Sequence, residues 1–374
     1  MKLVRILATL GLAACATQET TAPALSSDVA LDQGTNAVGA VYTQTNDATA
    51  NAIRQYSRAS DGSLTFVASY TTGGTGNGAA GLGSQGSVII ARNRFLLAVN
   101  AGSNQISSFA IGAGGLTLVE AISSGGTFPI SLTSHGDLIY VLNAGSDNVT
   151  GFRLDNSGDL TSIPGSTRGL SGTGTGPAQI GFHPDGSRLV VTEKMTNKID
   201  VFTVSSTGTL SEPTVHQSSG ATPFGFEFSE RGYLIVSEAF GGAPNASATS
   251  SYSLENGGLV TRSASVTTTE TAACWVVITT NQKFVYVTNT GSNSVSGYRL
   301  GADGTLSLLD ADGVTGATGG APIDAALSRN SQFLYTLDRA AGAISIFAVN
   351  ADGSLSKLGT QTGVPTTSFG LIAR

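Results

Sequence analysis

Short apolar runs and polar turns follow one another along most of this chain in a repeating order. In one repeat, an apolar run at residues 275–279 is followed by runs at 284–289, 294–300 and 306–309, with polar turns between them. Runs of this length, some with strict alternation of apolar and polar positions, predict β-strands. We therefore expect four antiparallel strands in each repeat.

Each repeat also carries an aromatic residue near the end of its third expected strand and a leucine seven or eight residues later. The aromatic residues are Tyr56, Phe109, Phe152, Phe202, Tyr252, Tyr298 and Phe347. The leucines are Leu64, Leu116, Leu160, Leu210, Leu259, Leu306 and Leu355. Successive leucines lie 44 to 52 residues apart, a period typical of solenoids, arrays and propellers.

The two ends of the repeat region are complementary. Residues 38–43 match a second strand with no inner strand before them, and residues 368–373 match an inner strand without a repeat of its own. A linear solenoid would not leave such halves, and closure into a ring protects strand edges. The predicted fold class is all-β, a seven-bladed β-propeller of four-stranded blades over residues 34–374, in which the C-terminal strand joins the first blade.

Composition agrees with this fold and limits the partners. The chain has 49 glycines among 374 residues and 12% charged residues, which favours short strands and tight turns over long helices. The formal net charge is −6, and Lys and Arg do not cluster. Binding to nucleic acid needs a basic stripe that neutralises phosphates, so we expect no nucleic-acid partner.

The first residues have the layout of a secretory signal. Lys2 and Arg5 precede an apolar stretch at residues 6–14 that is too short to span a bilayer. The stretch ends in Leu12-Ala13-Ala14-Cys15, which resembles the lipobox of bacterial lipoproteins, whose cysteine is acylated. We expect a signal peptide over residues 1–14, lipidation at Cys15 and a flexible, Ser/Thr-rich tether over residues 15–33.

This leader predicts that the protein lies at the bacterial cell envelope, on the periplasmic or outer-membrane face, with membrane contact through the lipid anchor only. Ala14-Cys15-Ala16 also fits ordinary signal cleavage. The alternative is therefore a soluble secreted or periplasmic protein.

Residues 284–289 spell Phe-Val-Tyr-Val-Thr-Asn, the Tyr-Val-Thr-Asn repeat of surface-layer and lactonase propellers, and residues 96–104 and 139–145 are variants of it. Residues 182–186 and 302–306 add the turn pattern of the same family. From about residue 34 onward, the chain resembles the seven-bladed lactonase family, which includes 6-phosphogluconolactonases and fungal carboxymuconate-lactonising enzymes. Such a repeat specifies the fold well and the function poorly, because propellers host many activities.

The resemblance implies an active site with a histidine, an arginine and a glutamate on middle blades. Counting blades aligns the histidine with residues 177–179 and the arginine with residues 223–225, where neither occurs, and the glutamate with Glu238. Matching residues 176–179 to the Gly-Pro-Arg-His motif of the family makes Glu193 the glutamate and again leaves no histidine. Both registers stay open, and in both the base and the cation of the family are missing.

Two functions remain open, and with them the question of whether the protein is an enzyme. The leading hypothesis is a ligand- or protein-binding module, with a small sugar, a lactone or an envelope protein bound at the mouth of the ring. The alternative is a lactone hydrolase that opens the ring as a 6-phosphogluconolactonase does, with Glu238 or Glu193 as base. A structural surface-layer role is a third possibility. Polar and aromatic candidates for ligand binding are Gln85, Gln179, Trp275, Asp324 and Arg339.

We expect no cofactor and no metal. Residues 76–81 spell the dinucleotide-binding fingerprint, but they lead into another strand and not into a helix, so we interpret them as a flexible loop between blades. The three histidines, His135, His183 and His216, lie far apart in the sequence. A zinc site needs several convergent ligands.

Overall fold

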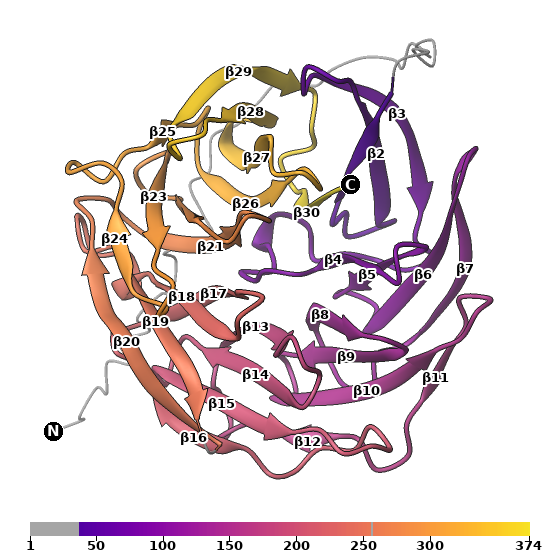
Figure 1. Cartoon of the computed structure of the whole chain (residues 1–374). Coiled ribbons are helices and arrows are strands. Elements are labelled where there is room, and N and C mark those ends of the chain that lie inside the picture. Colours follow the sequence, from indigo (N-terminus) through magenta and orange to yellow (C-terminus); the bar gives the residue numbers. More distant parts are fainter. Residues whose placement is uncertain (1–36, 256) are drawn as a thin grey trace, which may run out of the picture.

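Seven antiparallel sheets form a closed ring in the computed structural model, which describes residues 37–255 and 257–374. Figure 1 shows the sheets as blades around a common centre, with the C-terminus beside that centre. The seven-bladed, four-stranded propeller predicted from the sequence is confirmed. The signal peptide, Cys15 and the tether lie outside the described residues. Among the described residues, no helix is long and apolar enough to cross a membrane.

The first four blades contain these strands, given from the inner to the outer strand. Blade 1 has β30 (Phe369–Ala373), β1 (Gly39–Gln44), β2 (Ala52–Arg58) and β3 (Leu64–Thr71). Blade 2 has β4 (Val88–Ala91), β5 (Phe95–Asn100), β6 (Gln105–Gly112) and β7 (Gly115–Ser123). Blade 3 has β8 (Pro129–His135), β9 (Leu138–Asn143), β10 (Asn148–Leu154) and β11 (Leu160–Ser162), with β12 (Arg168–Gly169) also on β10. Blade 4 has β13 (Pro177–Phe182), β14 (Arg188–Glu193), β15 (Lys198–Thr203) and β16 (Thr214–Gln217).

The last three blades follow the same order. Blade 5 has β17 (Pro223–Phe228), β18 (Tyr233–Glu238), β19 (Ala248–Glu255) and β20 (Gly258–Thr267). Blade 6 has β21 (Ala273–Ile278), β22 (Phe284–Asn289), β23 (Ser294–Leu300) and β24 (Leu306–Leu308), with β25 (Gly316–Ala317) also on β23. Blade 7 has β26 (Pro322–Leu327), β27 (Phe333–Asp338), β28 (Ala343–Val349) and β29 (Leu355–Thr362). The part of the chain that the structure describes also contains three short 3-10 helices, η1 (Gly78–Ala80), η2 (Phe240–Gly242) and η3 (Arg339–Ala341).

The C-terminal strand closes the ring. β30 pairs antiparallel with β1, with Tyr42 opposite Ile372 and Thr43 opposite Leu371. The complementary halves found in the sequence therefore form one composite blade, as predicted. In blade 6 the inner strand begins two residues earlier than predicted, because Ala273 pairs with Asn289 ahead of a bulge.

The repeated aromatic and leucine residues pack one blade against the next. In blade 6, Tyr298 and Leu306 are buried in a cluster that also contains Ile235 of blade 5. The turn between the third and fourth strands approaches the preceding blade so closely that a Cβ on Gly304, whose φ is +85°, would lie 2.5 Å from the Tyr233 ring. Glycine is needed here both for the left-handed backbone and for the close approach.

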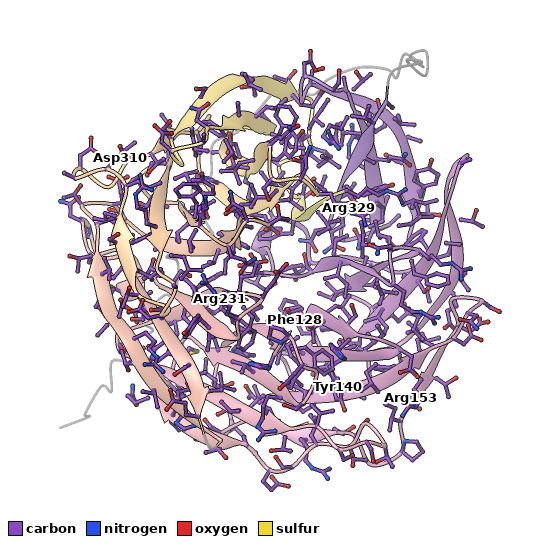
Figure 2. The ribbon with its side chains drawn as sticks, in the orientation of Figure 1. Phe128, Tyr140, Arg153, Arg231, Asp310 and Arg329 are labelled. Carbon is purple, nitrogen blue, oxygen red and sulfur yellow. The ribbon has the colours of Figure 1, made fainter. Side chains whose placement is uncertain are left out.

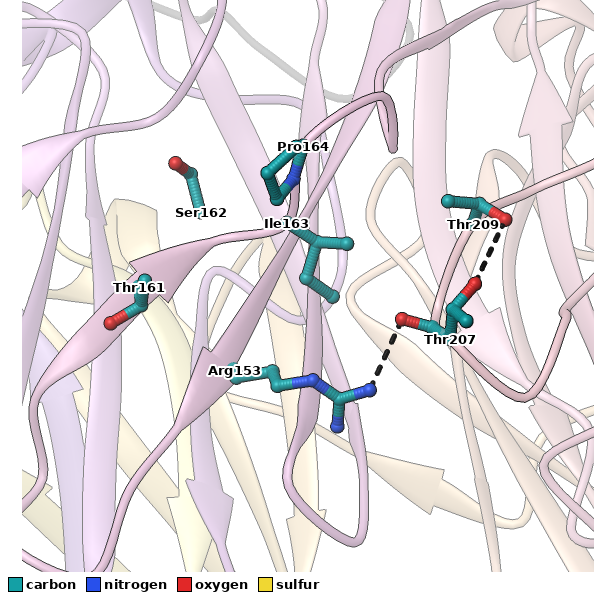
Figure 3. A pocket seen from close by; sticks show the side chains of 7 residues that line it. All are labelled: Arg153, Thr161, Ser162, Ile163, Pro164, Thr207 and Thr209. Atoms are coloured by element: carbon teal, nitrogen blue, oxygen red, sulfur yellow. Dashed lines mark hydrogen bonds between the residues drawn. The ribbon is translucent and has the colours of Figure 1, made fainter.

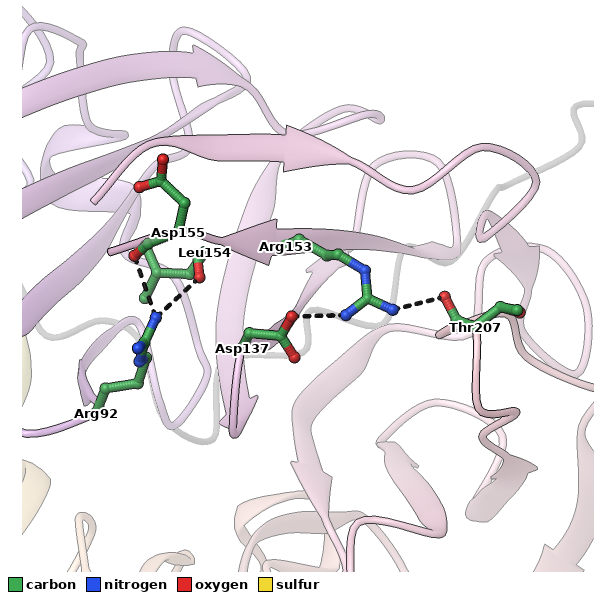
Figure 4. A network of polar contacts seen from close by, with 6 residues as sticks. All are labelled: Arg92, Asp137, Arg153, Leu154, Asp155 and Thr207. Carbon is green, nitrogen blue, oxygen red and sulfur yellow. Dashed lines mark hydrogen bonds and ion pairs between the residues drawn. The ribbon is translucent and has the colours of Figure 1, made fainter. Parts of the chain in front are cut away.

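In other blades, the glycine at the equivalent turn position accepts a hydrogen bond through its carbonyl oxygen from a tyrosine of the preceding blade. The hydroxyl of Tyr286 donates to Gly353 O at 2.8 Å, and that of Tyr335 donates to Gly62 O at 3.0 Å, which joins blade 7 to blade 1. Nearer the rim, arginines add further links, shown in Figure 4, where Arg92 donates to Leu154 O and Asp155 O, both at 3.2 Å. Hydrogen bonds between neighbouring blades thus supplement the apolar packing.

One face of the ring gathers the beginnings of the inner strands and the ends of the second strands. The registers place Pro177 opposite Glu193, Pro223 opposite Glu238 and Pro322 opposite Asp338. We call this face, where all predicted active-site positions fall, the mouth. Figure 2 shows Phe128, which directly precedes β8, near the centre of the ring, whereas Arg153 and Asp310 lie toward its periphery.

Candidate functional site

Glu193 and Glu238 occupy one position of the repeat, the last residue of the second strand, which we call the cap position. The other blades have Gln44, Asn100, Asn143, Asn289 and Asp338 there. All seven side chains are fully buried. Because every blade places a polar, buried side chain at this position, the two glutamates share a structural role with their counterparts.

The contacts of Glu238 show what that role is. Its Oε1 accepts hydrogen bonds from the Gly220 N–H at 2.8 Å and from the Ser250 hydroxyl at 2.5 Å. Its Oε2 accepts one from the Ser265 hydroxyl at 2.6 Å. The carboxylate therefore ties the linker that leads into blade 5 to the third and fourth strands of that blade, and it satisfies donors that would otherwise be buried without a partner.

Glu193 differs from Glu238 because a second carboxyl group lies beside it. Oε1 and Oε2 of Glu193 accept from the N–H and hydroxyl of Ser171, at 3.1 and 2.7 Å, and Oε2 also accepts from Thr196. Burial, with the hydrogen bond and charge of Glu193, raises the pKa of Asp200 to about 8. The Asp200 carboxyl group is therefore mostly protonated at neutral pH. The other blades from blade 2 onward have a hydroxyl at the Asp200 position, namely Ser107, Thr150, Ser250, Ser296 and Ser345.

Gln179, Trp275 and Asp324, predicted as ligand-binding residues, share another position of the repeat, the third residue of the inner strand. The Gln179 amide donates to Phe226 O at 2.9 Å and accepts from Phe226 N–H at 2.6 Å. Asp324 accepts from Leu371 N–H at 3.0 Å, and burial raises its pKa well above the usual value. Both side chains thus join neighbouring inner strands. Their role in binding, like a catalytic role for Glu193 and Glu238, stays a prediction.

The loop that carries Gln85 crosses the centre of the ring. The Gln85 amide donates to Val276 O at 2.7 Å and accepts from Val276 N–H at 3.0 Å, in blade 6. Its backbone N–H donates to Ala178 O of blade 4 at 3.3 Å, and Ser84 O accepts from the Trp275 indole N–H at 3.0 Å. The loop lies between blades 1 and 2, as predicted, but contacts with blades 4 and 6 require it to cross the ring. In Figure 1, the backbone next to β4 lies at the centre of the ring.

Two cations on the mouth contact this loop. They stand directly after the cap position, where the seven blades have Thr45, Ala101, Ala144, Lys194, Ala239, Thr290 and Arg339. Lys194 donates to Gly83 O and Arg339 donates to Ala79 O. Blades 4 and 7 are three places apart in the ring, so the two cations approach the loop from opposite sides.

Each of the two cations lies over an aromatic ring of an inner strand. Lys194 Nζ is 4.8 Å from the centroid of Phe224, and the Arg339 guanidinium carbon is 5.2 Å from that of Phe369. Both distances are within the range of cation–π attraction. Burial lowers the pKa of Lys194 to about 8. Arg339 was predicted from the sequence and Lys194 was not, although comparing the repeats at this position would have found it.

A separate hollow lies at the periphery, between blades 3 and 4 (Figure 3). It is lined by Arg153, Thr161, Ser162, Ile163, Pro164, Thr207 and Thr209. Its one charged group, Arg153, is engaged by the Asp137 carboxylate at 2.6 Å and by Thr207 O at 3.1 Å (Figure 4). The hollow therefore offers no charged group for a ligand. Within residues 37–255 and 257–374, no group of three or more His, Cys, Asp or Glu side chains could hold a metal ion.

Comparison with known proteins identifies the family. The model of the family described as "Lactonase, 7-bladed beta-propeller" matches residues 47–171, 163–239 and 246–370. A search of curated proteins found no significant relative.

Solved structures share the fold at low sequence identity. A candidate 6-phosphogluconolactonase from Bacteroides fragilis has a TM-score of 0.71 at 18% identity, over 92% of this chain and 100% of its own. A protein from Lactobacillus plantarum has a TM-score of 0.73 at 21% identity, over 90% and 99%. The periplasmic gluconolactonase of Pseudomonas aeruginosa has a TM-score of 0.70 at 15% identity, over 90% and 98%. With the family model matched along most of its length, this chain belongs to the lactonase family of seven-bladed β-propellers.

Proposed function

We propose that this protein is a ligand-binding module of the bacterial cell envelope and that the mouth of its propeller is the binding surface. The observation that carries the proposal is the departure of Lys194 and Arg339 from the repeat. Five blades have a small alanine or threonine at this position, so the blade itself does not require a cation there. Two cations at equivalent positions on opposite sides of one face suit recognition of a ligand between them.

The surroundings of the two cations support a small polar ligand. Phe224, Trp275 and Phe369 lie at the beginnings of inner strands, and the Phe224 and Trp275 rings are 5.1 Å apart. All three rings are buried while residues 76–87 are in place, so a sugar ring could pack against them only after this loop moves, whereas the cations can bind its polar substituents. The envelope location rests on the leader, with Lys2, Arg5 and the lipobox-like ending at Cys15.

Isothermal titration calorimetry on the full-length protein tests this proposal. The panel contains neutral sugars, sugar acids and sugar lactones, and the variants are Lys194→Gln and Arg339→Gln. Lys283→Gln serves as the matched control, because Lys283 is exposed in the turn between β21 and β22, away from the mouth. Binding of at least one compound should weaken about tenfold or more in both mouth variants and stay unchanged in the control. Equal binding by all variants would contradict the proposal.

Lactone hydrolysis with Glu238 or Glu193 as base is the second candidate, and membership of the lactonase family favours it. Each carboxyl group is fully buried and hydrogen-bonded to the linker of its own blade, so water would reach it only if that linker moved. Hydrolysis of a panel of sugar and aliphatic lactones by wild type, Glu238→Gln and Glu193→Gln separates the two candidates. Turnover by wild type that one variant abolishes would make the protein a hydrolase. No turnover of any lactone by wild type, with both variants folded and indistinguishable from it, would reject this candidate.

A further inference from the structure

We propose that residues 76–87 form a strap that occupies the mouth in place of a ligand, and that a ligand with a carboxylate or phosphate group displaces it. This inference rests on the proposed function of the mouth and concerns its regulation. It starts from the polar partners of Lys194 and Arg339. Lys194 donates to the carbonyl oxygen of Gly83, and Arg339 donates to that of Ala79 and, outside these residues, to that of Thr366 at 2.7 Å. Both cations are therefore engaged by neutral acceptors that belong to the chain itself.

An anionic ligand would be the better partner for both cations. The bonds to the strap carbonyls are charge-assisted through the donor alone, whereas an anionic oxygen would add the direct attraction between opposite charges. The strap has no charged residue (Gly-Asn-Gly-Ala-Ala-Gly-Leu-Gly-Ser-Gln-Gly-Ser), so it offers only neutral acceptors. The strap carbonyls thus mark where two anionic oxygens, or an anionic and a hydroxyl oxygen, would lie in the complex.

The length of this linker exceeds what joining two blades requires. Sixteen residues separate Thr71 from Val88, whereas five separate Ser123 from Pro129 and five separate Thr267 from Ala273. The longer linker can leave the mouth while the blades on either side stay in place. The remaining connections from the last paired strand of one blade to the inner strand of the next contain seven residues (170–176), five (218–222), four (318–321) and six (363–368).

The strap also has the composition of a segment that changes conformation. Five of its twelve residues are glycine, and Gly78, Gly81, Gly83 and Gly86 have positive φ. Its one large apolar side chain, Leu82, is 5% exposed and packs in the core cluster. Hydrogen bonds to inner strands hold the rest, among them Ser84 hydroxyl to Ile130 O and Leu132 N–H to Gly86 O, both at 2.8 Å. A segment with one apolar anchor that is otherwise held by hydrogen bonds can exchange between a docked and a released state.

Trp275 reports on the strap directly. It is the only tryptophan of the chain, it is fully buried, and its indole N–H donates to Ser84 O. Release of the strap removes this partner and opens the indole to solvent. Quenching of the tryptophan emission by acrylamide therefore measures the released fraction without any ligand.

Two variants of the full-length protein should release the strap by different means. In Gly81→Ala the new Cβ would lie 2.5 Å from the Phe369 ring at a φ of +73°, and Leu82→Ser removes the apolar anchor. Gly136→Ala is the matched control, because Gly136 has a φ of +61° and no neighbour within 4 Å of the added Cβ. Acrylamide quenching of Trp275 should rise in both strap variants and stay at the wild-type level in the control.

The probes are D-gluconate, D-glucose 6-phosphate and neutral D-glucose, which separate a carboxylate, a phosphate and an uncharged sugar. Apparent affinity scales with the fraction of protein whose site is free, so a strap variant that raises this fraction tenfold should bind an anionic probe about tenfold more tightly. The apparent affinity for D-glucose should rise much less. Saturation of wild type with an anionic probe should also raise the quenching of Trp275.

Three results would overturn the inference. The first is that the strap variants show increased quenching of Trp275 but bind both anionic probes no more tightly than wild type does. Another is an equal gain for D-glucose, which would remove the preference for an anion. The third is binding of an anionic probe to wild type through Lys194 and Arg339 without any increase in the acrylamide quenching of Trp275. That result would keep the mouth as the binding surface and would reject only the displacement of the strap.

Discussion

Substitution of Glu238 measures what a buried cap residue contributes to the propeller. Three donors, the Gly220 N–H and the hydroxyls of Ser250 and Ser265, lie 2.5 to 2.8 Å from its carboxylate oxygens. Glu238→Ala would leave all three without this acceptor in the protein interior. A hydrogen bond to a charged group contributes about 1.5–3 kcal/mol, and a buried unsatisfied donor costs about 1–3 kcal/mol. Since the hydroxyls can turn toward other acceptors, we expect a loss of about 3–5 kcal/mol in the free energy of unfolding.

Glu238→Gln keeps the shape of the side chain and one carbonyl oxygen. The Ser265 hydroxyl can then accept from the new amide, so only the charge assistance is lost, and the expected loss is about 1–2 kcal/mol. Urea denaturation followed by Trp275 fluorescence compares both variants with Glu212→Gln, whose side chain is 85% exposed. The control should change stability by less than about 0.5 kcal/mol. If Glu238→Ala unfolded at the same urea concentration as the control, the structural role assigned to the cap position would be wrong.

Two further predictions concern single positions of the repeat. Asp200→Asn should flatten the pH dependence of stability between about pH 4 and 8. In this range the folded wild type keeps a proton on Asp200 that the unfolded chain releases, so wild-type stability falls as the pH rises. This group contributes at most about 1.4 kcal/mol per pH unit to the fall. Denaturation at a series of pH values measures the difference, and parallel curves would refute it. Gly304→Ala should lower stability by about 2–4 kcal/mol, whereas Gly257→Ala, with a φ of +83° and no neighbour within 4 Å, should lose only about 1–2 kcal/mol; equal losses would contradict the packing argument.

The sequence predicts the fold well because the repeat encodes the contacts between blades. Tyr298 and Leu306 pack against the neighbouring blade, and their recurrence reports seven such interfaces. The unmatched strands at the two ends predict closure, which pairing of β1 with β30 confirms. In contrast, the path of residues 76–87 depends on contacts such as that of Gln85 with Val276, 191 residues apart, which exist only once the ring has closed.

The candidate site is predicted only in part. Counting blades places Glu238, and the alternative register places Glu193, at the end of a second strand, where the structure has them. Their burial could not be predicted, because their partners are hydroxyl and amide groups from linkers and third strands with no sequence signature of their own. The sequence also gives no direct sign of Lys194, whose importance emerges only when the cap positions of all blades are aligned.

The most direct test of the account is hydrogen–deuterium exchange of the full-length protein with and without D-gluconate. Amide exchange reports local opening segment by segment. The account predicts that D-gluconate speeds exchange in residues 76–87, slows it in the loops around Lys194 and Arg339, and leaves the turn that contains Lys283 unchanged. D-gluconate that binds with exchange altered only at the periphery or on the face opposite the mouth would contradict it.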